Sequence, residues 1–118
     1  MMAIETCGYH DPLAVSRARQ RMLPPEADSI LRPLGTALCD PVRLKICLAL
    51  SGASLTVKDL ARVIEKSQST TSQHLRILRD IGAVRADRDG RRVTYSITND
   101  GIGRSVTGMV DALDQVAV

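Results

Sequence analysis

One change in hydrophobic period, at Gly82, constrains the fold of this 118-residue chain more than any other feature. Before Gly82, apolar side chains recur at the three- and four-residue spacing of amphipathic helices. Residues 84–97 instead alternate apolar and polar side chains around Asp89-Gly90, which is typical of a tight β-hairpin turn. Helical spacing then returns over residues 102–116. The pattern predicts a mainly α chain with one small β-hairpin, an α+β fold.

Capping residues divide the region before the hairpin into short helices. Asp40, Thr56 and Ser67 each suit the N-cap position, because their side-chain oxygens can accept a hydrogen bond from the first helical turn. The helices expected after them span residues 41–51, 57–66 and 68–81. A preceding helix begins at Pro25 and contains Pro33, which should kink or split it.

The chain divides into two parts. Residues 1–24 show no clear period apart from a short basic helix expected over residues 13–23, and we interpret them as an N-terminal arm. Residues 25–118 hold the remaining helices and the hairpin and form one domain. The last helix has a wider apolar stripe than one small domain needs to cover, made of Ile102, Val106, Met109, Val110, Leu113 and Val116.

Two helices joined by almost no linker and followed by a basic hairpin indicate a winged helix-turn-helix. Residues 68–92 carry six Arg and three Asp, a balance of +3 that equals the net charge of the whole chain. On the second helix, the polar side chains expected to be exposed and to bond bases or phosphates are Gln68, Ser69, Thr70, Thr71, Gln73, His74 and Arg76. The hairpin tip adds Arg88, Arg91 and Arg92, which can contact phosphates or enter the adjacent minor groove.

The composition argues against several other classes of protein. The chain is 44% hydrophobic and 25% charged, as in ordinary globular domains, and its two aromatic residues are too few for the stacking platforms of a single-strand binder. No apolar run could span a bilayer and no signal peptide is recognisable, so we expect a cytoplasmic protein without membrane contact. No glycine-rich phosphate loop or nucleophile motif occurs, so we do not expect an enzyme.

Four sequence blocks, in this order, resemble the signature of the ArsR/SmtB family. They are Leu38–Leu44, Thr56–Ala61, Gln68–Leu78 and Asp89–Tyr95. The resemblance covers residues 28–117. Members of this family are dimeric bacterial winged-helix repressors that leave their operator DNA when a metal, a metalloid or an oxidant is sensed. The resemblance implies a homodimer sealed largely by terminal helices, with a recognition helix at residues 68–76 and a wing at residues 88–92.

The positions that hold metal ligands in well-known family members lack them here. Thr56 and Lys58 stand where the arsenic and cadmium sensors carry thiols, and the last helix contains no His. The remaining candidates for a metal or redox sensor are Cys7, Cys39, Cys47 and His10. Cys39 and Cys47 would lie about 12 Å apart along an unbroken helix, so we expect Cys7 and His10 to join one of them. Thiolates favour soft ions such as Cd(II), Pb(II), Hg(II) or As(III).

The function predicted from the sequence is therefore a homodimeric transcriptional repressor that binds operator DNA and is released by a soft metal or metalloid ion acting at cysteine thiols. Three alternatives stay open. An oxidant could act on the same thiols. The repressor could respond to no effector, with the cysteines serving only as packing residues. The winged helix could instead be a protein-interaction module.

Overall fold

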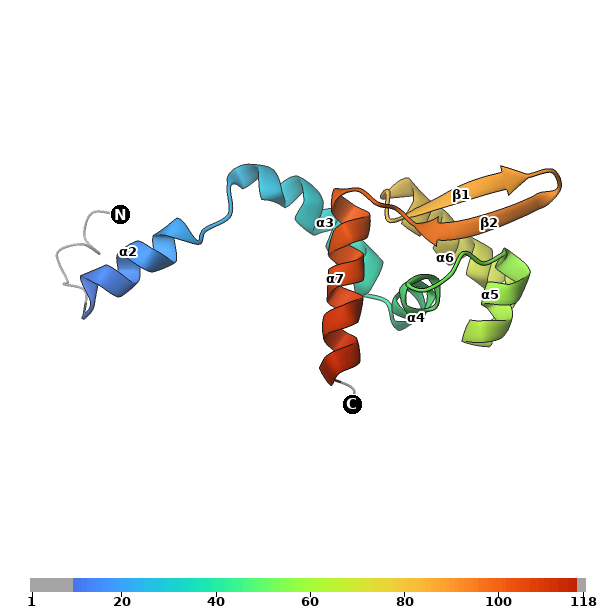
Figure 1. Cartoon of the computed structure of the whole chain (residues 1–118), viewed down its shortest axis with the longest axis horizontal. Coiled ribbons are helices and arrows are strands. Elements are labelled where there is room, and N and C mark those ends of the chain that lie inside the picture. The colour runs from blue at the N-terminus through green and yellow to red at the C-terminus, as the bar shows by residue number, and fades with distance from the viewer. Residues whose placement is uncertain (1–9, 117–118) are drawn as a thin grey trace.

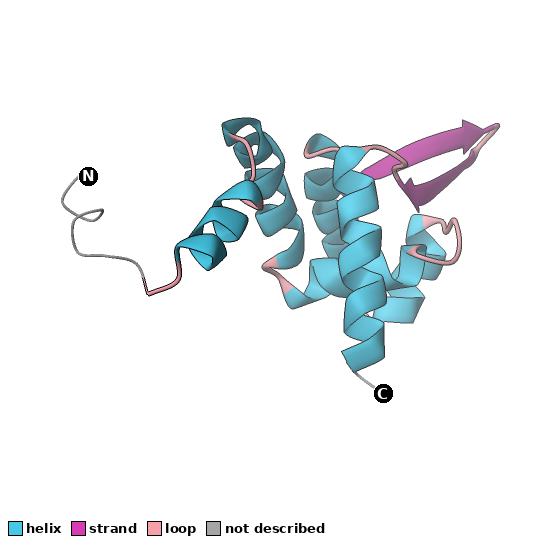
Figure 2. Cartoon of the chain, turned by 60° about the vertical axis from the view of Figure 1, so that its left-hand side comes forward, coloured by secondary structure: helices cyan, strands magenta, loops and turns pink. Residues whose placement is uncertain are grey.

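The computed structural model describes residues 10–116 and shows a mainly helical winged helix-turn-helix, which confirms the predicted fold class (Figures 1 and 2). Its elements are α2 (Pro12–Gln20), the 3-10 helix η1 (Pro25–Ala27), α3 (Asp28–Leu38), α4 (Pro41–Leu50), α5 (Val57–Ile64), α6 (Gln68–Asp80), β1 (Val84–Asp89), β2 (Arg92–Ile97) and α7 (Gly101–Val116). Over the described range, none of these helices combines the length and apolar character that a bilayer crossing requires.

The three predicted N-caps are all present. The Asp40 carboxylate accepts a 2.8 Å hydrogen bond from the Val42 N–H at the start of α4. Thr56 caps α5 and Ser67 caps α6 in the same way. Between α5 and α6 the chain turns at Glu65, which adopts a left-handed conformation with φ of 58°. This residue shortens the connection to a tight turn, as a helix-turn-helix requires.

The N-terminal helices differ from the prediction in detail. The first begins one residue earlier than expected, because the Asp11 side chain accepts a hydrogen bond from the Ala14 N–H and caps α2. It also ends sooner, at Gln20. The helix that contains Pro33 is continuous, so of the predicted kink or split the split does not occur, and the first turn of the predicted helix, Pro25–Ala27, is a 3-10 helix. Proline removes a single N–H from a helix, and α3 packs against α7.

The hairpin pairs Asp89 with Arg92, leaving Gly90 and Arg91 as a two-residue loop. Only Gly90 has a positive φ in this loop, 63°, which is the pattern of a type II′ turn with glycine in first place. At the base of the hairpin, the Leu55 and Tyr95 backbones exchange hydrogen bonds of 3.1 and 2.7 Å. This pairing fixes the hairpin to the loop that precedes α5.

The core lies where α4, α5, α6 and α7 meet the base of the hairpin. Its largest fully buried side chains include Ile46, Leu60, Leu75, Leu78 and Val106. Helix α7 packs against α3 and α4. Helix α2 contributes no buried residue and lies at the opposite end of the molecule from the hairpin (Figure 1).

Candidate nucleic-acid interface and sensor residues

Helix α6 presents a polar face to solvent. Its N-terminal turn is fixed by the Ser67 cap, and Leu75 and Leu78 anchor its other face in the core. Of the side chains that the sequence predicts on the exposed face, Gln68, Ser69, Gln73 and Arg76 are exposed and Thr70 is half-buried. These amides, hydroxyls and the guanidinium are free to approach base edges and phosphates.

The predicted exposure of Thr71 is wrong. Thr71 is fully buried, and its hydroxyl donates a 2.8 Å hydrogen bond to the Ser67 carbonyl oxygen. It lies four residues before Leu75 and therefore on the same, inward face of the helix. A buried hydroxyl bonded to its own helix does not present a donor to DNA.

His74 is also less exposed than the sequence predicts. The residue is half-buried, and its Nδ1 atom is buried without a hydrogen-bond partner among the described residues. The hydrogen bond from the Val42 backbone holds the pKa of Asp40 below its usual value, and the charges of His74 and Arg43 lower it further. His74 therefore interacts with the start of α4, and its predicted contact with DNA is not supported by its position.

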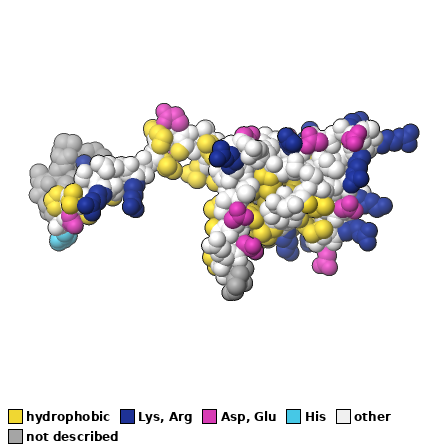
Figure 3. Space-filling model, in the orientation of Figure 1, with side chains coloured by type: hydrophobic (Ala, Val, Ile, Leu, Met, Phe, Trp, Pro, Cys, Tyr) yellow, Lys and Arg dark blue, Asp and Glu magenta, His cyan; other side chains and the backbone are white. Residues whose placement is uncertain are grey.

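The hairpin tip carries its arginines outward. Arg88, Arg91 and Arg92 are all exposed, while Arg85 nearer the base pairs with Asp87 at 3.1 Å. Figure 3 shows Lys and Arg side chains gathered at the hairpin end of the molecule. The tip is thus a concentrated positive charge on a narrow projection, a shape that suits a groove bordered by phosphates.

The sequence reasoning missed further residues next to this surface. Arg79 and Tyr95 line a cleft of about 370 Å³ between α6 and the hairpin. Arg79 lies one turn after Arg76, and this spacing alone could have predicted that both lie on the same face of the helix. Tyr95 could not be assigned to the cleft from the sequence, because its position beside α6 depends on how the hairpin folds back.

The two described cysteines lie on separate segments, because a new helix begins at the predicted cap Asp40 between them, and the distance along an unbroken helix does not apply. Cys39 follows the end of α3, whereas Cys47 is inside α4. Cys47 is fully buried in the core, and burial raises the pKa of its thiol to about 11. A neutral, inaccessible thiol is a poor ligand and a poor nucleophile, so the position of Cys47 does not favour a sensing role.

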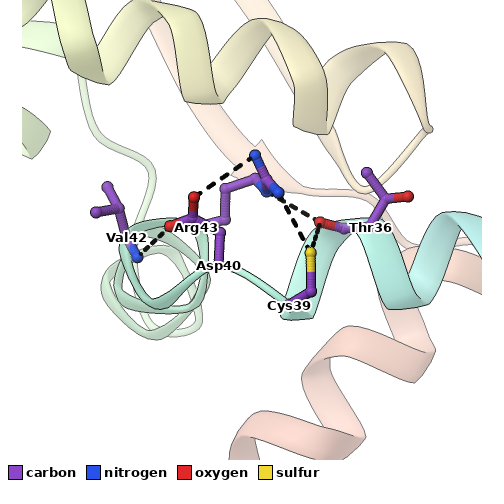
Figure 4. A network of polar contacts seen from close by, with 5 residues as sticks. All are labelled: Thr36, Cys39, Asp40, Val42 and Arg43. Carbon is purple, nitrogen blue, oxygen red and sulfur yellow. Dashed lines mark hydrogen bonds and ion pairs between the residues drawn. The ribbon is translucent and has the colours of Figure 1, made fainter.

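Cys39 is exposed and lies in a polar network at the junction of α3 and α4 (Figure 4). Its Sγ accepts a 3.5 Å hydrogen bond from Arg43 Nη2 and donates one of 3.5 Å to the Thr36 carbonyl oxygen. Arg43 also donates through Nε to the same Thr36 oxygen at 2.9 Å and lies 3.9 Å from the Asp40 carboxylate. Arg43 therefore links the Cys39 thiol to the N-cap of α4.

The other sensor candidates are not brought together. Cys7 lies outside the described residues, and His10 is exposed at the start of the described chain. Between residues 10 and 116, no three His, Cys, Asp or Glu side chains are close enough to hold a metal ion. Cys39 is thus the candidate thiol that the structure leaves accessible within this range.

Comparison with known proteins identifies the family. The sequence profile of bacterial regulatory proteins of the arsR family matches residues 40–86. The cadmium resistance transcriptional regulatory protein CadC of Listeria innocua is 37% identical over 95 residues, which are 80% of this chain and 77% of that protein. The transcriptional regulator NmtR of Mycobacterium tuberculosis is 46% identical over 61 residues, 52% of this chain. The chain spans 51% of the length of NmtR.

A solved structure agrees with these relatives. The homodimeric winged helix-turn-helix DNA-binding domain of Mb0332 from Mycobacterium bovis superposes with a TM-score of 0.65 at 26% identity. The alignment covers 82% of this chain and 88% of that domain. The likeness therefore extends over most of the chain in both sequence and structure. This chain belongs to the ArsR family of bacterial regulatory proteins.

Proposed function

We propose that this chain is a homodimeric transcriptional repressor that binds double-stranded operator DNA in the cytoplasm. The proposal rests on one observation: the chain exposes both a polar face on α6 and an arginine-bearing tip on the hairpin. Helix α6 enters the major groove, where Gln73 faces the bases and Arg76 lies beside the phosphates, and the tip enters the adjacent minor groove. The regulators CadC and NmtR, to which the chain is similar, support this function.

The second copy of the chain covers the apolar side of α3 and α7. Leu31, Met109 and Leu113 are exposed there, at 62%, 45% and 40% of their surface. Figure 3 shows hydrophobic side chains on this part of the surface, away from the hairpin end of the molecule. Large apolar side chains gathered in one patch favour an interface, and the similar Mb0332 domain is homodimeric.

Salt-dependent binding to duplex DNA tests the interface. Arg91→Ala should weaken binding to every duplex and reduce its salt dependence, because it removes a phosphate contact. Gln73→Ala should mainly reduce the preference for the operator over other duplexes, because it removes a base contact. Arg104→Ala, on the polar face of α7, is the matched control and should change neither. Binding that is unaffected by both test substitutions would contradict the proposed interface.

We further propose that the repressor is released by a thiophilic ion such as Cd(II), Pb(II), Hg(II) or As(III) that binds Cys39. Coordination would replace the thiol proton and occupy the Sγ electron pair to which Arg43 donates at 3.5 Å. Arg43 would then lose this hydrogen bond at the junction where it also contacts Asp40. Because Asp40 caps α4 and interacts with His74, the change reaches helix α6. The described residues do not complete a metal site, so Cys7 is the proposed second ligand.

Cysteine substitutions test the release. Cys39→Ser should abolish release of the operator by Cd(II) and As(III), whereas Cys47→Ala should retain it, because Cys47 is buried. Cys7→Ser should weaken the response if the arm supplies a ligand. Release by peroxide but not by metal, again lost in Cys39→Ser, would instead support the redox alternative. A response that survives substitution of all three cysteines would refute sensing by thiols.

A further inference from the structure

The cleft between α6 and the hairpin contains two charged residues, Arg79 and Asp80, that are not among the predicted DNA-binding residues. Its lining consists of Ser72, Leu75, Arg76, Arg79, Asp80 and Tyr95. Leu75 is buried, and the two arginines and Asp80 are exposed. The cleft therefore combines one buried apolar side chain with three exposed charged ones.

The two arginines of this cleft are not neutralised by the protein. Arg76 and Arg79 lie three residues apart and so project from neighbouring positions on one face of α6. Across residues 10–116, the side-chain ion pairs within 4 Å join Arg43 with Asp40 and Arg85 with Asp87. Asp80 lines the cleft without pairing with either arginine. Two guanidiniums against one carboxylate leave the cleft positive and suited to an anion.

Both walls of the cleft are held in place before any ligand arrives. On one side, α6 is anchored in the core by Leu75 and Leu78. On the other side, the Tyr95 backbone is bonded to Leu55 and paired with Ala86 within the hairpin. A preformed site loses little conformational entropy when it binds.

We propose that this cleft holds a phosphodiester of the operator, with Arg76 and Arg79 contacting the phosphate and the hydroxyls of Ser72 and Tyr95 lining the site. This inference rests on the proposed function. The major groove and the adjacent minor groove of a duplex are separated by one sugar–phosphate strand. When α6 occupies the first groove and the hairpin tip the second, that strand passes between α6 and the hairpin. The cleft lies in this position.

The salt dependence of duplex binding tests the proposal in the full-length chain. Each phosphate contact contributes about 0.9 to the slope of log affinity against log salt, so Arg79→Ala should reduce the slope by about 1.8 across a dimer. The affinity should fall by a similar factor for the operator and for an unrelated duplex. Asp80→Asn should tighten binding to both duplexes, because it removes the carboxylate from the cleft. Arg104→Ala and Asp111→Asn on α7 are the matched controls and should leave the slope unchanged.

Three further measurements keep the outcomes separate. Arg79→Lys should retain the slope, and thermal unfolding should show that all variants fold. An unchanged slope in Arg79→Ala, with Arg91→Ala still weakening binding, would overturn the cleft proposal but not the proposed function. Absence of duplex binding by the unaltered chain would overturn the function itself. Displacement of the operator by inorganic phosphate at constant ionic strength, lost in Arg79→Ala, would show that the cleft binds free phosphate instead.

Discussion

Cys47 offers a quantitative test of the distinction between a core residue and a sensor. The pKa of its thiol is raised from 9.0 to about 11 by burial, so the folded chain keeps it neutral where the unfolded chain ionises it. The unfolded state then binds fewer protons than the folded state, and the free energy of unfolding falls as the pH rises from about 9 to 11. At about 1.4 kcal/mol for each pKa unit, this contribution reaches about 3 kcal/mol.

The variant Cys47→Ala removes this titration. At pH 7 it should be less stable than the unaltered chain by about 1 to 2 kcal/mol, because a buried sulfur is lost and a small cavity remains. Between pH 9 and 11 the difference should disappear or reverse. Urea unfolding of the reduced protein, at one fixed concentration and at several pH values, measures the difference directly.

The result that would refute this reasoning is a stability difference between the two chains that stays constant from pH 7 to 11. That result would mean that the thiol ionises equally in the folded and unfolded states and is therefore accessible. Cys47 would then become a sensor candidate again. Cys39→Ala provides the matched control, because it removes a thiol that is exposed and lies outside the core.

Three further predictions concern the α4 cap, the start of α7 and the dimer. The pKa of Asp40 is lowered on folding, so it stabilises the chain above the pKa of an ordinary carboxyl, about 3.9, and this stability is lost as the pH falls through the lower folded value. Asp40→Asn should therefore flatten the acid side of the stability curve measured by urea unfolding, and an unchanged acid side would contradict the shift. A Cβ added at Gly103 would overlap the backbone and side chain of Thr98, so Gly103→Ala should destabilise the fold by about 1 to 3 kcal/mol in thermal unfolding. Equal melting temperatures would show that α7 can move away at no cost. Leu113→Glu should shift the chain from dimer to monomer in analytical ultracentrifugation, whereas Asp111→Asn should not, and a persistent dimer would place the interface elsewhere.

Much of the fold was predictable because its signals are local. The side chains of Asp40, Thr56 and Ser67 accept hydrogen bonds from N–H groups only two or three residues away. Gly90 adopts the positive φ of the turn because glycine has no Cβ, whatever its neighbours are. Glu65 gave no such signal, since a non-glycine residue in the left-handed region is held there by the helices on either side.

The sequence alone therefore determined the order of helices and hairpin, the boundaries set by caps and turns, and the concentration of arginine over residues 68–92. Only the tertiary structure decided which polar side chains remain accessible. Thr71 and His74 look as polar in sequence as Gln73, yet packing against other helices takes them partly or fully out of solvent. Likewise, Cys39 and Cys47 have the same chemistry and opposite surroundings. Burial depends on residues distant in the chain, and a local pattern does not contain their positions.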